Sequence, residues 1–330
     1  MRQLTPGKLR GLAATSTSNH VFSVLALDHR QSFARMIDPQ APDQVSYTRI
    51  ASTKIDFVRE LSNMVSAVLL DPIYGAPQCI ASGALPGKNG LMIAVEETGY
   101  TGDSTGRKSS LLPGWSVAKS KRIGAEAVKL LVYYHPGAGQ FATHQEKLVQ
   151  QVIAECQQED ITLFLEIMVY PIDPRQTRNS PEFTRGLPTL LEEIARRMGS
   201  YNPDVLKLEF PVDPAIETDE KRWSAACEAV SAAAGCPWTV LSAGAEFELF
   251  CRQVEIACKA GASGFIAGRA VWKDGVRLTG EERLSWLRQT AAPRFARLTS
   301  LADLFARPWT DFFPPIDPSQ YENWYPHYPA

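Results

Sequence analysis

The chain has 330 residues, of which 45% are hydrophobic and 21% are charged, and its formal net charge is -2. This composition is typical of a globular protein with a sizeable core, and the near-neutral charge argues against nucleic acid or an anionic membrane surface as a partner. The N-terminus lacks the apolar run of a secretory signal, and no stretch approaches the ~18 apolar residues of a membrane span, so we expect a cytoplasmic protein.

Short apolar runs rich in Val, Ile and Leu recur along the chain and are typical of strands that are buried on both faces. The stretches between them show helical periodicity, most clearly in four places. The runs begin at residues 21, 67, 91, 127, 163, 205, 238 and 264, and the clearest helices are expected over 143–160, 187–200, 221–235 and 246–262.

Eight alternating strand and helix units predict an α/β protein with a single closed (β/α)8 barrel, a TIM barrel, over residues 1–305. A doubly wound open sheet is the alternative, but no GxGxxG follows the first strand, where "LDHRQSF" stands instead. Residues 306–330 are crowded with proline and aromatic side chains. They predict an aromatic and proline-rich C-terminal extension, which either packs as an arm on the barrel or on a neighbouring subunit, or is a partly disordered tail.

Polar residues stand at the carboxyl ends of the expected strands, where barrel enzymes carry their catalytic groups. These candidates are Asp28, His29, Arg30, Glu96, Glu97, Lys129, Glu166, Lys207 and Glu209.

Two lysines and two carboxylates are expected to meet inside the barrel. The alternation of a strand puts Lys207 and Glu209 on one face, and if that face is inward they meet Lys129 and Glu166 from the two preceding strands. We expect the neighbouring ammonium to lower the pKa of one lysine toward neutrality. An uncharged amine attacks carbonyl carbon, which favours Schiff-base chemistry. The alternative is a pair of purely structural lysine-glutamate bridges.

Two consecutive strand ends carry small residues that suit a phosphate site. "LSAG" contains Ser242 and Gly244, and "AGR" contains Gly268 and Arg269. Small residues let backbone N–H groups approach an anion, and an arginine adds a forked donor. We therefore expect a sugar phosphate to bind there.

A metal or another cofactor is not expected. The five histidines show no HxxH or HxxxH spacing, and the six cysteines include no CxxC pair. These are the spacings that zinc sites commonly use.

The residues resemble the class I tagatose-1,6-bisphosphate aldolases, within the wider group of lysine-dependent barrel aldolases. The resemblance spans nearly the whole chain up to "RPWTDF". It rests on the motifs "LALDHR", "EETGYTGDST", "GAEAVKLLVYY", "FLEIMVY", "DVLKLEFPV", "LSAGAEFELF" and "AGASGFIAGRAVW", in this order.

The resemblance implies a lyase in which Lys207 forms the Schiff base, Glu166 is the general acid/base and Lys129 stands beside them. It further implies substrate contacts from Asp28, His29, Arg30, Glu96, Glu209, Ser242, Gly244, Gly268 and Arg269. Glutamine is usual in the family where this chain has His29, and lysine is commoner where it has Glu97.

Two other functions stay open at this point. A sulfofructose-phosphate aldolase shares "GASGF.AGRAVW" and the lysine of the fourth strand, and a barrel that only binds sugar phosphate would need no nucleophile. Barrels of this kind often form dimers, so a homodimer is also possible.

Overall fold

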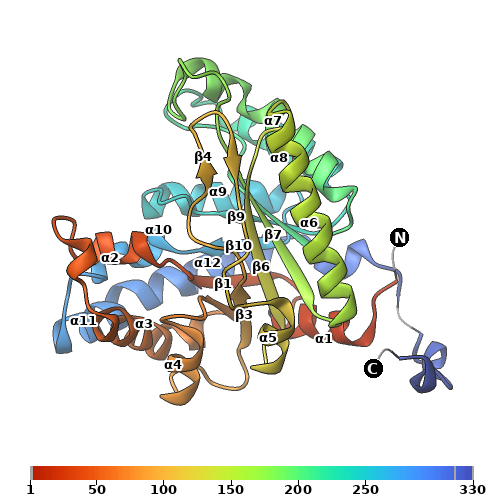
Figure 1. The fold of residues 1–330 in the computed structure, drawn as a ribbon, viewed down its shortest axis with the longest axis horizontal. Coiled ribbons are helices and arrows are strands. Elements are labelled where there is room, and N and C mark those ends of the chain that lie inside the picture. The colour runs from red at the N-terminus through yellow and green to blue at the C-terminus, as the bar shows by residue number, and fades with distance from the viewer. Residues whose placement is uncertain (1–2, 316, 329–330) are drawn as a thin grey trace.

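A computed structural model describes residues 3–315 and 317–328. Its centre is a closed barrel of eight parallel strands, in the spatial order β1-β10-β9-β8-β7-β6-β3-β2 (Figure 1). β1 pairs with both β2 and β10, which closes the ring and rules out the open sheet. The barrel strands are β1 (Phe22–Leu27), β2 (Ala67–Leu70), β3 (Gly90–Ala94), β6 (Ala127–Tyr134), β7 (Thr162–Val169), β8 (Val205–Leu208), β9 (Trp238–Leu241) and β10 (Gly264–Ala267).

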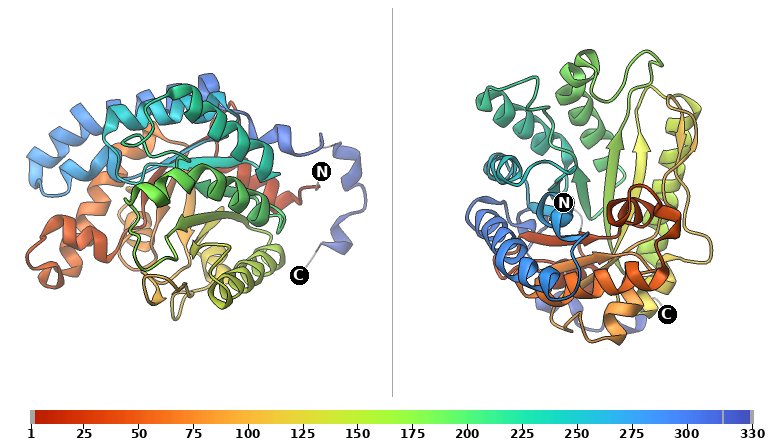
Figure 2. Two further views of the ribbon diagram at one scale, coloured as in Figure 1. Left: turned by 90° about the horizontal axis from the view of Figure 1, so that it is seen from above. Right: turned by 90° about the vertical axis from the view of Figure 1, so that its left-hand side faces the viewer.

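Helices surround the barrel on its outside, as the two views of Figure 2 show. The four helices predicted most clearly are present as α6, α7, α8 and α9. α8 shows why such a helix begins and ends where it does: the carboxylate of Asp219 accepts a hydrogen bond from the N–H of Lys221, and Gly235 follows with a φ of 65°. The helices are α1 (Pro6–Ala14), α2 (Gln31–Ile37), α3 (Tyr47–Leu61), α4 (Ala76–Ala81), α5 (Val117–Arg122), α6 (Gln140–Gln158), α7 (Pro181–Gly199), α8 (Glu220–Ala234), α9 (Phe247–Lys259), α10 (Arg269–Trp272), α11 (Gly280–Trp286) and α12 (Ala292–Phe305). Among the described residues, none of these helices is long and apolar enough to cross a membrane.

The strands are buried on both faces because they separate two apolar cores. One core lies between the barrel and its helices, and the other fills the barrel interior. The interior core takes every second residue of a strand, as a pleated strand requires. Its members include Phe22, Val24, Ala26, Ala67, Leu69, Met92, Ala94, Ala127, Phe164, Val205 and Ile266.

A small hairpin that the sequence did not predict follows β3. Its strands, β4 (Thr101–Gly102) and β5 (Arg107–Lys108), are antiparallel and have two residues each. The carboxylate of Asp103 accepts from the N–H groups of Thr105 and Gly106, which fixes the turn. β5 packs against β6 and α6, so the hairpin stands beside the carboxyl end of the barrel (Figure 1).

The C-terminal extension lies at the opposite end of the barrel. Trp309 is buried in the interior core, and its indole N–H donates to the hydroxyl of Ser16 over 3.0 Å. The backbone N–H of the same residue donates to the carbonyl of His20. The described part of the extension is therefore an arm packed on its own barrel, in short 3-10 turns such as Trp309–Phe312. The predicted boundary between the barrel, which ends at residue 305, and the extension, which begins at residue 306, stays a prediction.

Candidate active site

Five ionisable side chains gather inside the carboxyl end of the barrel. Each stands two residues after an apolar residue of the interior core, so the strand alternation turns all five inward. Ala26, Ala94, Ala127, Phe164 and Val205 precede them. The five are Asp28, Glu96, Lys129, Glu166 and Lys207, and all except Asp28 are buried.

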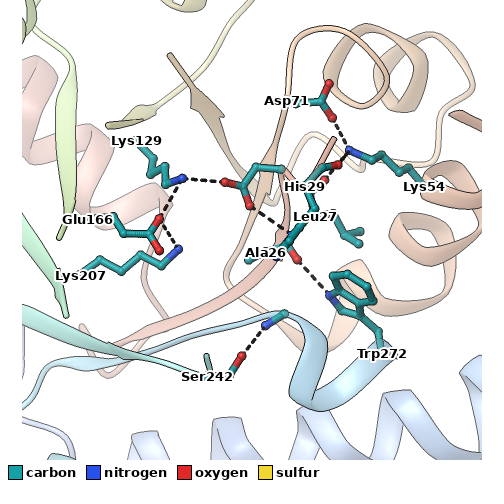
Figure 3. A network of polar contacts seen from close by, with 12 residues as sticks. Ala26, Leu27, His29, Lys54, Asp71, Lys129, Glu166, Lys207, Ser242 and Trp272 are labelled. Carbon is teal, nitrogen blue, oxygen red and sulfur yellow. Dashed lines mark hydrogen bonds and ion pairs between the residues drawn. The ribbon is translucent and has the colours of Figure 1, made fainter. Parts of the chain in front are cut away.

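Lys207 and Glu166 stand at the same level of neighbouring strands, because β7 and β8 pair these two residues directly. The Lys207 Nζ donates to Glu166 Oε2 over 2.9 Å, and the Lys129 Nζ lies 2.8 Å from the same oxygen (Figure 3). The predicted meeting of both lysines with Glu166 is thus present in the structure.

Lys129 lies among three carboxylates. Its Nζ donates to Glu96 over 2.6 Å and to Asp28 over 2.8 Å, in addition to its contact with Glu166. Burial alone would lower the pKa of Lys129, but the charges of Asp28, Glu166 and Glu96 outweigh it and raise this pKa well above its usual value. Lys129 is therefore a permanent ammonium at the centre of the site.

The two lysines also hold the carboxylates in their ionised form. Burial would raise the pKa of Glu166, but the charges of Lys129 and Lys207 more than offset it and lower this pKa. The same balance lowers the pKa of Asp28 far below its usual value, again mainly through Lys129. Glu166 is consequently a carboxylate that can accept a proton.

Glu209 does not join this cluster, although the sequence predicted that it would. β8 ends at Leu208, and beyond it Glu209 forms an ion pair with Arg178 and accepts from the N–H of Val169 over 3.3 Å. Burial raises the pKa of Glu209 despite the nearby Arg178. Asp28 and Glu96 complete the cluster in its place.

A buried ion pair fixes the carboxyl end of β1. The Lys54 ammonium donates to the carbonyls of Leu27 and His29, over 2.7 Å each, and to the carboxylate of Asp71 (Figure 3). Both charged side chains are fully buried. The two carbonyls flank Asp28, so this ion pair sets the backbone that carries the Asp28 carboxylate.

Lys54 and Asp71 were not identified from the sequence, although each leaves a signal there. Lys54 interrupts the apolar face of a helix at the spacing of Ile50 and Phe57, and Asp71 directly follows a buried strand. A charge in either place requires a partner in the core.

His29 and Arg30 follow Asp28 and line the mouth of the barrel. His29 packs edge-on against Trp272, with 5.3 Å between ring centroids, and burial lowers the pKa of its imidazole to about 4. It is therefore neutral near pH 7. The Arg30 guanidinium is buried, donates to the carbonyl of Glu96 over 2.6 Å and lies 3.7 Å from Glu97.

The predicted anion site lies at the carboxyl ends of β9 and β10. The N–H of Gly268 reaches the hydroxyl of Ser242 over 3.4 Å, and Gly244 has a φ of 84°, which favours glycine. Arg269 borders a cleft of about 580 Å³. Its walls also carry Lys273 and Arg277, two cations that the sequence analysis missed.

Known proteins resemble this chain along most of its length. The sequence profile of the DeoC/LacD family aldolases matches residues 22–274. Tagatose 1,6-diphosphate aldolase 2 of Streptococcus pyogenes serotype M3 is 32% identical over 327 residues, which cover 93% of this chain and 98% of that protein. Tagatose 1,6-diphosphate aldolase of Lactococcus lactis subsp. lactis is 32% identical over 326 residues, covering 93% and 99%.

Solved structures share the fold at lower identity. A Schiff-base-forming fructose-1,6-bisphosphate aldolase superposes with a TM-score of 0.55 at 21% identity, covering 90% of this chain and 99% of that one. Fructose-bisphosphate aldolase from Plasmodium falciparum superposes with a TM-score of 0.68 at 13% identity, covering 93% and 98%. Likeness at these identities concerns the barrel architecture alone.

Proposed function

The chain belongs to the DeoC/LacD family of aldolases, and on this premise we propose that it is a class I aldolase that cleaves tagatose 1,6-bisphosphate through a Schiff base on Lys207. The products are dihydroxyacetone phosphate and glyceraldehyde 3-phosphate. The observation that carries the proposal is the hydrogen bond between the buried amine of Lys207 and the ionised carboxylate of Glu166.

Of the two lysines, Lys207 has fewer carboxylates that depend on its charge. Among the residues that the structure describes, Lys207 forms an ion pair with Glu166 only, and Glu166 has Lys129 as a second cationic partner. Loss of the charge on Lys129, in contrast, would leave two carboxylates, Asp28 and Glu96, without an ammonium partner. Lys207 is therefore the nucleophile and Lys129 the fixed charge beside it.

The reaction begins when the neutral amine of Lys207 attacks the C2 carbonyl of the ketose. Loss of one water from the resulting carbinolamine leaves an iminium, whose positive nitrogen accepts electrons readily. Glu166 takes the proton of the C4 hydroxyl, and the electron pair of the C3–C4 bond moves toward the iminium nitrogen. Glyceraldehyde 3-phosphate leaves, and an enamine remains bound to Lys207.

The second half of the reaction restores the free amine. C3 of the enamine takes up a proton, which regenerates the iminium, and water then releases dihydroxyacetone phosphate from Lys207. Glu166 lies within 2.9 Å of the Lys207 nitrogen, so it is placed to return the proton that it removed. Lys129 keeps Glu166 ionised between turnovers.

The phosphate on C1 is assigned to the cleft beside Ser242, Gly244, Gly268 and Arg269. Backbone N–H groups, the guanidinium of Arg269 and the ammonium of Lys273 provide donors and positive charge there. Asp28 and His29 lie between this cleft and Lys129, where they can contact the sugar hydroxyls.

Borohydride trapping tests the covalent step. Incubation with dihydroxyacetone phosphate and borohydride should attach one triose phosphate to Lys207, as mass spectrometry of the digested protein would show. The variant Lys207→Met should take up no label, whereas Glu166→Gln should still be labelled. Label on another lysine, or no label, would contradict the proposal.

Substrate choice needs a separate comparison. A coupled assay for triose phosphate with tagatose 1,6-bisphosphate distinguishes an aldolase from a barrel that merely binds sugar phosphate. Faster cleavage of the sulfonated ketose phosphate than of the bisphosphate would instead assign the chain to the sulfo-sugar reaction. A cytoplasmic location and a homodimer remain predictions from the sequence.

A further inference from the structure

Arg107, on the hairpin strand β5, is surrounded by three tyrosine rings. The guanidinium carbon lies 4.5 Å from the ring centroid of Tyr100, 4.6 Å from that of Tyr170 and 5.3 Å from that of Tyr133. Aromatic faces attract a cation without neutralising its charge. Arg107 therefore keeps its full positive charge within a fixed frame, which we call the tyrosine frame.

This guanidinium has donors to spare. Arg107 forms no ion pair with any carboxylate among residues 3–315 and 317–328, and its Nε is buried without a hydrogen-bond partner. Two other arginines at this end of the barrel already face a carboxylate: Arg178 pairs with Glu209, and Arg30, whose Nη1 also lacks a hydrogen bond, lies 3.7 Å from Glu97. A buried donor without a partner is costly unless a ligand satisfies it.

Buried hydrogen bonds hold the hairpin backbone beside the tyrosine frame. The buried amide of Gln145 donates to the carbonyls of Arg107 and Tyr133 and to the hydroxyl of Ser109. The N–H of Arg107 reaches the hydroxyl of Tyr170 over 3.4 Å. These bonds tie the hairpin to β6, α6 and Tyr170, so buried side chains fix the backbone that carries the guanidinium.

The frame faces the anion cleft across the mouth of the barrel. In the closed order, β6 lies four strands from β10, so the two stand on opposite walls, with the lysines and Glu166 between them. Tyr133 follows Lys129 by four residues, so it lies on the same inward face, about 13 Å further along β6. A ketose whose C1 phosphate lies at β10 and whose C2 meets Lys207 points its far end at this wall.

We propose that Arg107, within the frame of Tyr100, Tyr133 and Tyr170, binds the phosphate on C6 of the ketose and so makes the enzyme selective for bisphosphates. A planar guanidinium with an unused N–H suits two phosphate oxygens. Arg30 is a poorer candidate for this phosphate because its guanidinium already donates to the carbonyl of Glu96 and lies 3.7 Å from the carboxylate of Glu97. The inference rests on the proposed aldolase reaction, since that reaction places C2 at Lys207.

The test compares two substrates that differ only at C6. Steady-state rates are measured with tagatose 1,6-bisphosphate and with tagatose 1-phosphate, whose C6 carries a hydroxyl. In Arg107→Met, kcat/KM for the bisphosphate should fall about 10- to 100-fold, the range expected for one charged hydrogen-bonding group. The same variant should leave kcat/KM for the monophosphate unchanged.

Lys108→Met is the matched control, because it removes the adjacent positive charge of the same hairpin. The Lys108 ammonium lies over the ring of Phe141, outside the tyrosine frame, so both substrates should be cleaved as by the wild type. An equal fall for both substrates in Arg107→Met would mean that the residue supports structure or chemistry, and would overturn the inference. No fall for either substrate would do the same.

A binding experiment separates this inference from the reaction itself. Hexitol 1,6-bisphosphate and hexitol 1-phosphate lack the carbonyl, so calorimetry reports their binding whether or not the protein has aldolase activity. Arg107→Met should weaken binding of the bisphosphate about 10- to 100-fold and leave the monophosphate unaffected. Equal affinities of the wild type for the two hexitols would overturn the phosphate site even in an active enzyme.

Discussion

Replacing Lys54 by methionine tests whether the buried pair under β1 supports both the stability of the barrel and the position of Asp28. The substitution keeps the volume of the side chain but leaves the Asp71 charge with two backbone donors, the N–H groups of Ile73 and Tyr74. Removing one partner of a buried ion pair costs about 3–5 kcal/mol of unfolding free energy. The substitution also removes the hydrogen bonds that Lys54 donates to the carbonyls of Leu27 and His29.

Urea unfolding, followed by tryptophan fluorescence, measures the loss of stability. Lys54→Met should lose about 3–5 kcal/mol, whereas the double variant Lys54→Met with Asp71→Asn should regain about 1–3 kcal/mol, since no uncompensated charge remains. Arg252→Met is the control: its partners Glu220 and Glu255 are accessible to solvent, and each such pair is worth about 0–1 kcal/mol.

Activity gives the second measurement on the same variants. The double variant restores charge balance but not the two hydrogen bonds to the β1 carbonyls, so its kcat should stay below that of the wild type under conditions where both are fully folded. A loss of less than about 1 kcal/mol in Lys54→Met would refute the reasoning. Wild-type kcat in the folded double variant would show that Asp28 does not depend on these bonds.

Two further changes act on the cluster itself, and a third acts on His29 beside it. Glu166→Gln should lower kcat by about 10²- to 10⁴-fold in a coupled triose phosphate assay, the usual contribution of an acid/base group. The pKa of Glu166 is lowered from 4.5 in the folded protein, so its carboxylate should stabilise the fold above about pH 4.5. This stabilisation is lost as the pH falls through the lower pKa of the folded state. The difference in unfolding free energy between wild type and Glu166→Gln should therefore narrow only below about pH 4.5. Lys129→Met removes the ammonium shared by three carboxylates, so the pKa of Glu166 should rise. An infrared titration of the carboxylates would detect this rise, and Lys129→Arg, which keeps the positive charge, is the control. His29→Gln should change kcat by less than about threefold. The imidazole of His29 is already neutral at pH 7, and both side chains offer a neutral donor and an acceptor. A tenfold loss of kcat would show that the ring itself is needed.

The barrel could be predicted because its strands are buried on both faces, which leaves unbroken apolar runs in the sequence. The meeting of Lys129, Glu166 and Lys207 could also be predicted, because it needs only the alternation of three consecutive strands. The same alternation would have placed Asp28 and Glu96 beside them, had it been counted from the apolar residues two positions earlier.

Other features depend on contacts that alternation does not encode. Glu209 was misplaced because the end of β8 and the position of Arg178, on a long loop, are set by tertiary packing. The hairpin that carries Arg107 has strands of two residues, which are too short for a recognisable pattern. Its position over the barrel mouth follows from the buried amide of Gln145, a residue of a helix that comes later in the chain.

The pairing of β1 with β10 has a consequence for folding during synthesis on the ribosome. Phe22 pairs with Gly264, so at 5–20 residues per second the ribosome needs about 10–50 s to deliver the second strand after the first. During that interval both edges of the growing sheet lack their last neighbour, and an unpaired edge is a template for other chains. Nascent chains of this protein should therefore depend on chaperones until the last strand emerges.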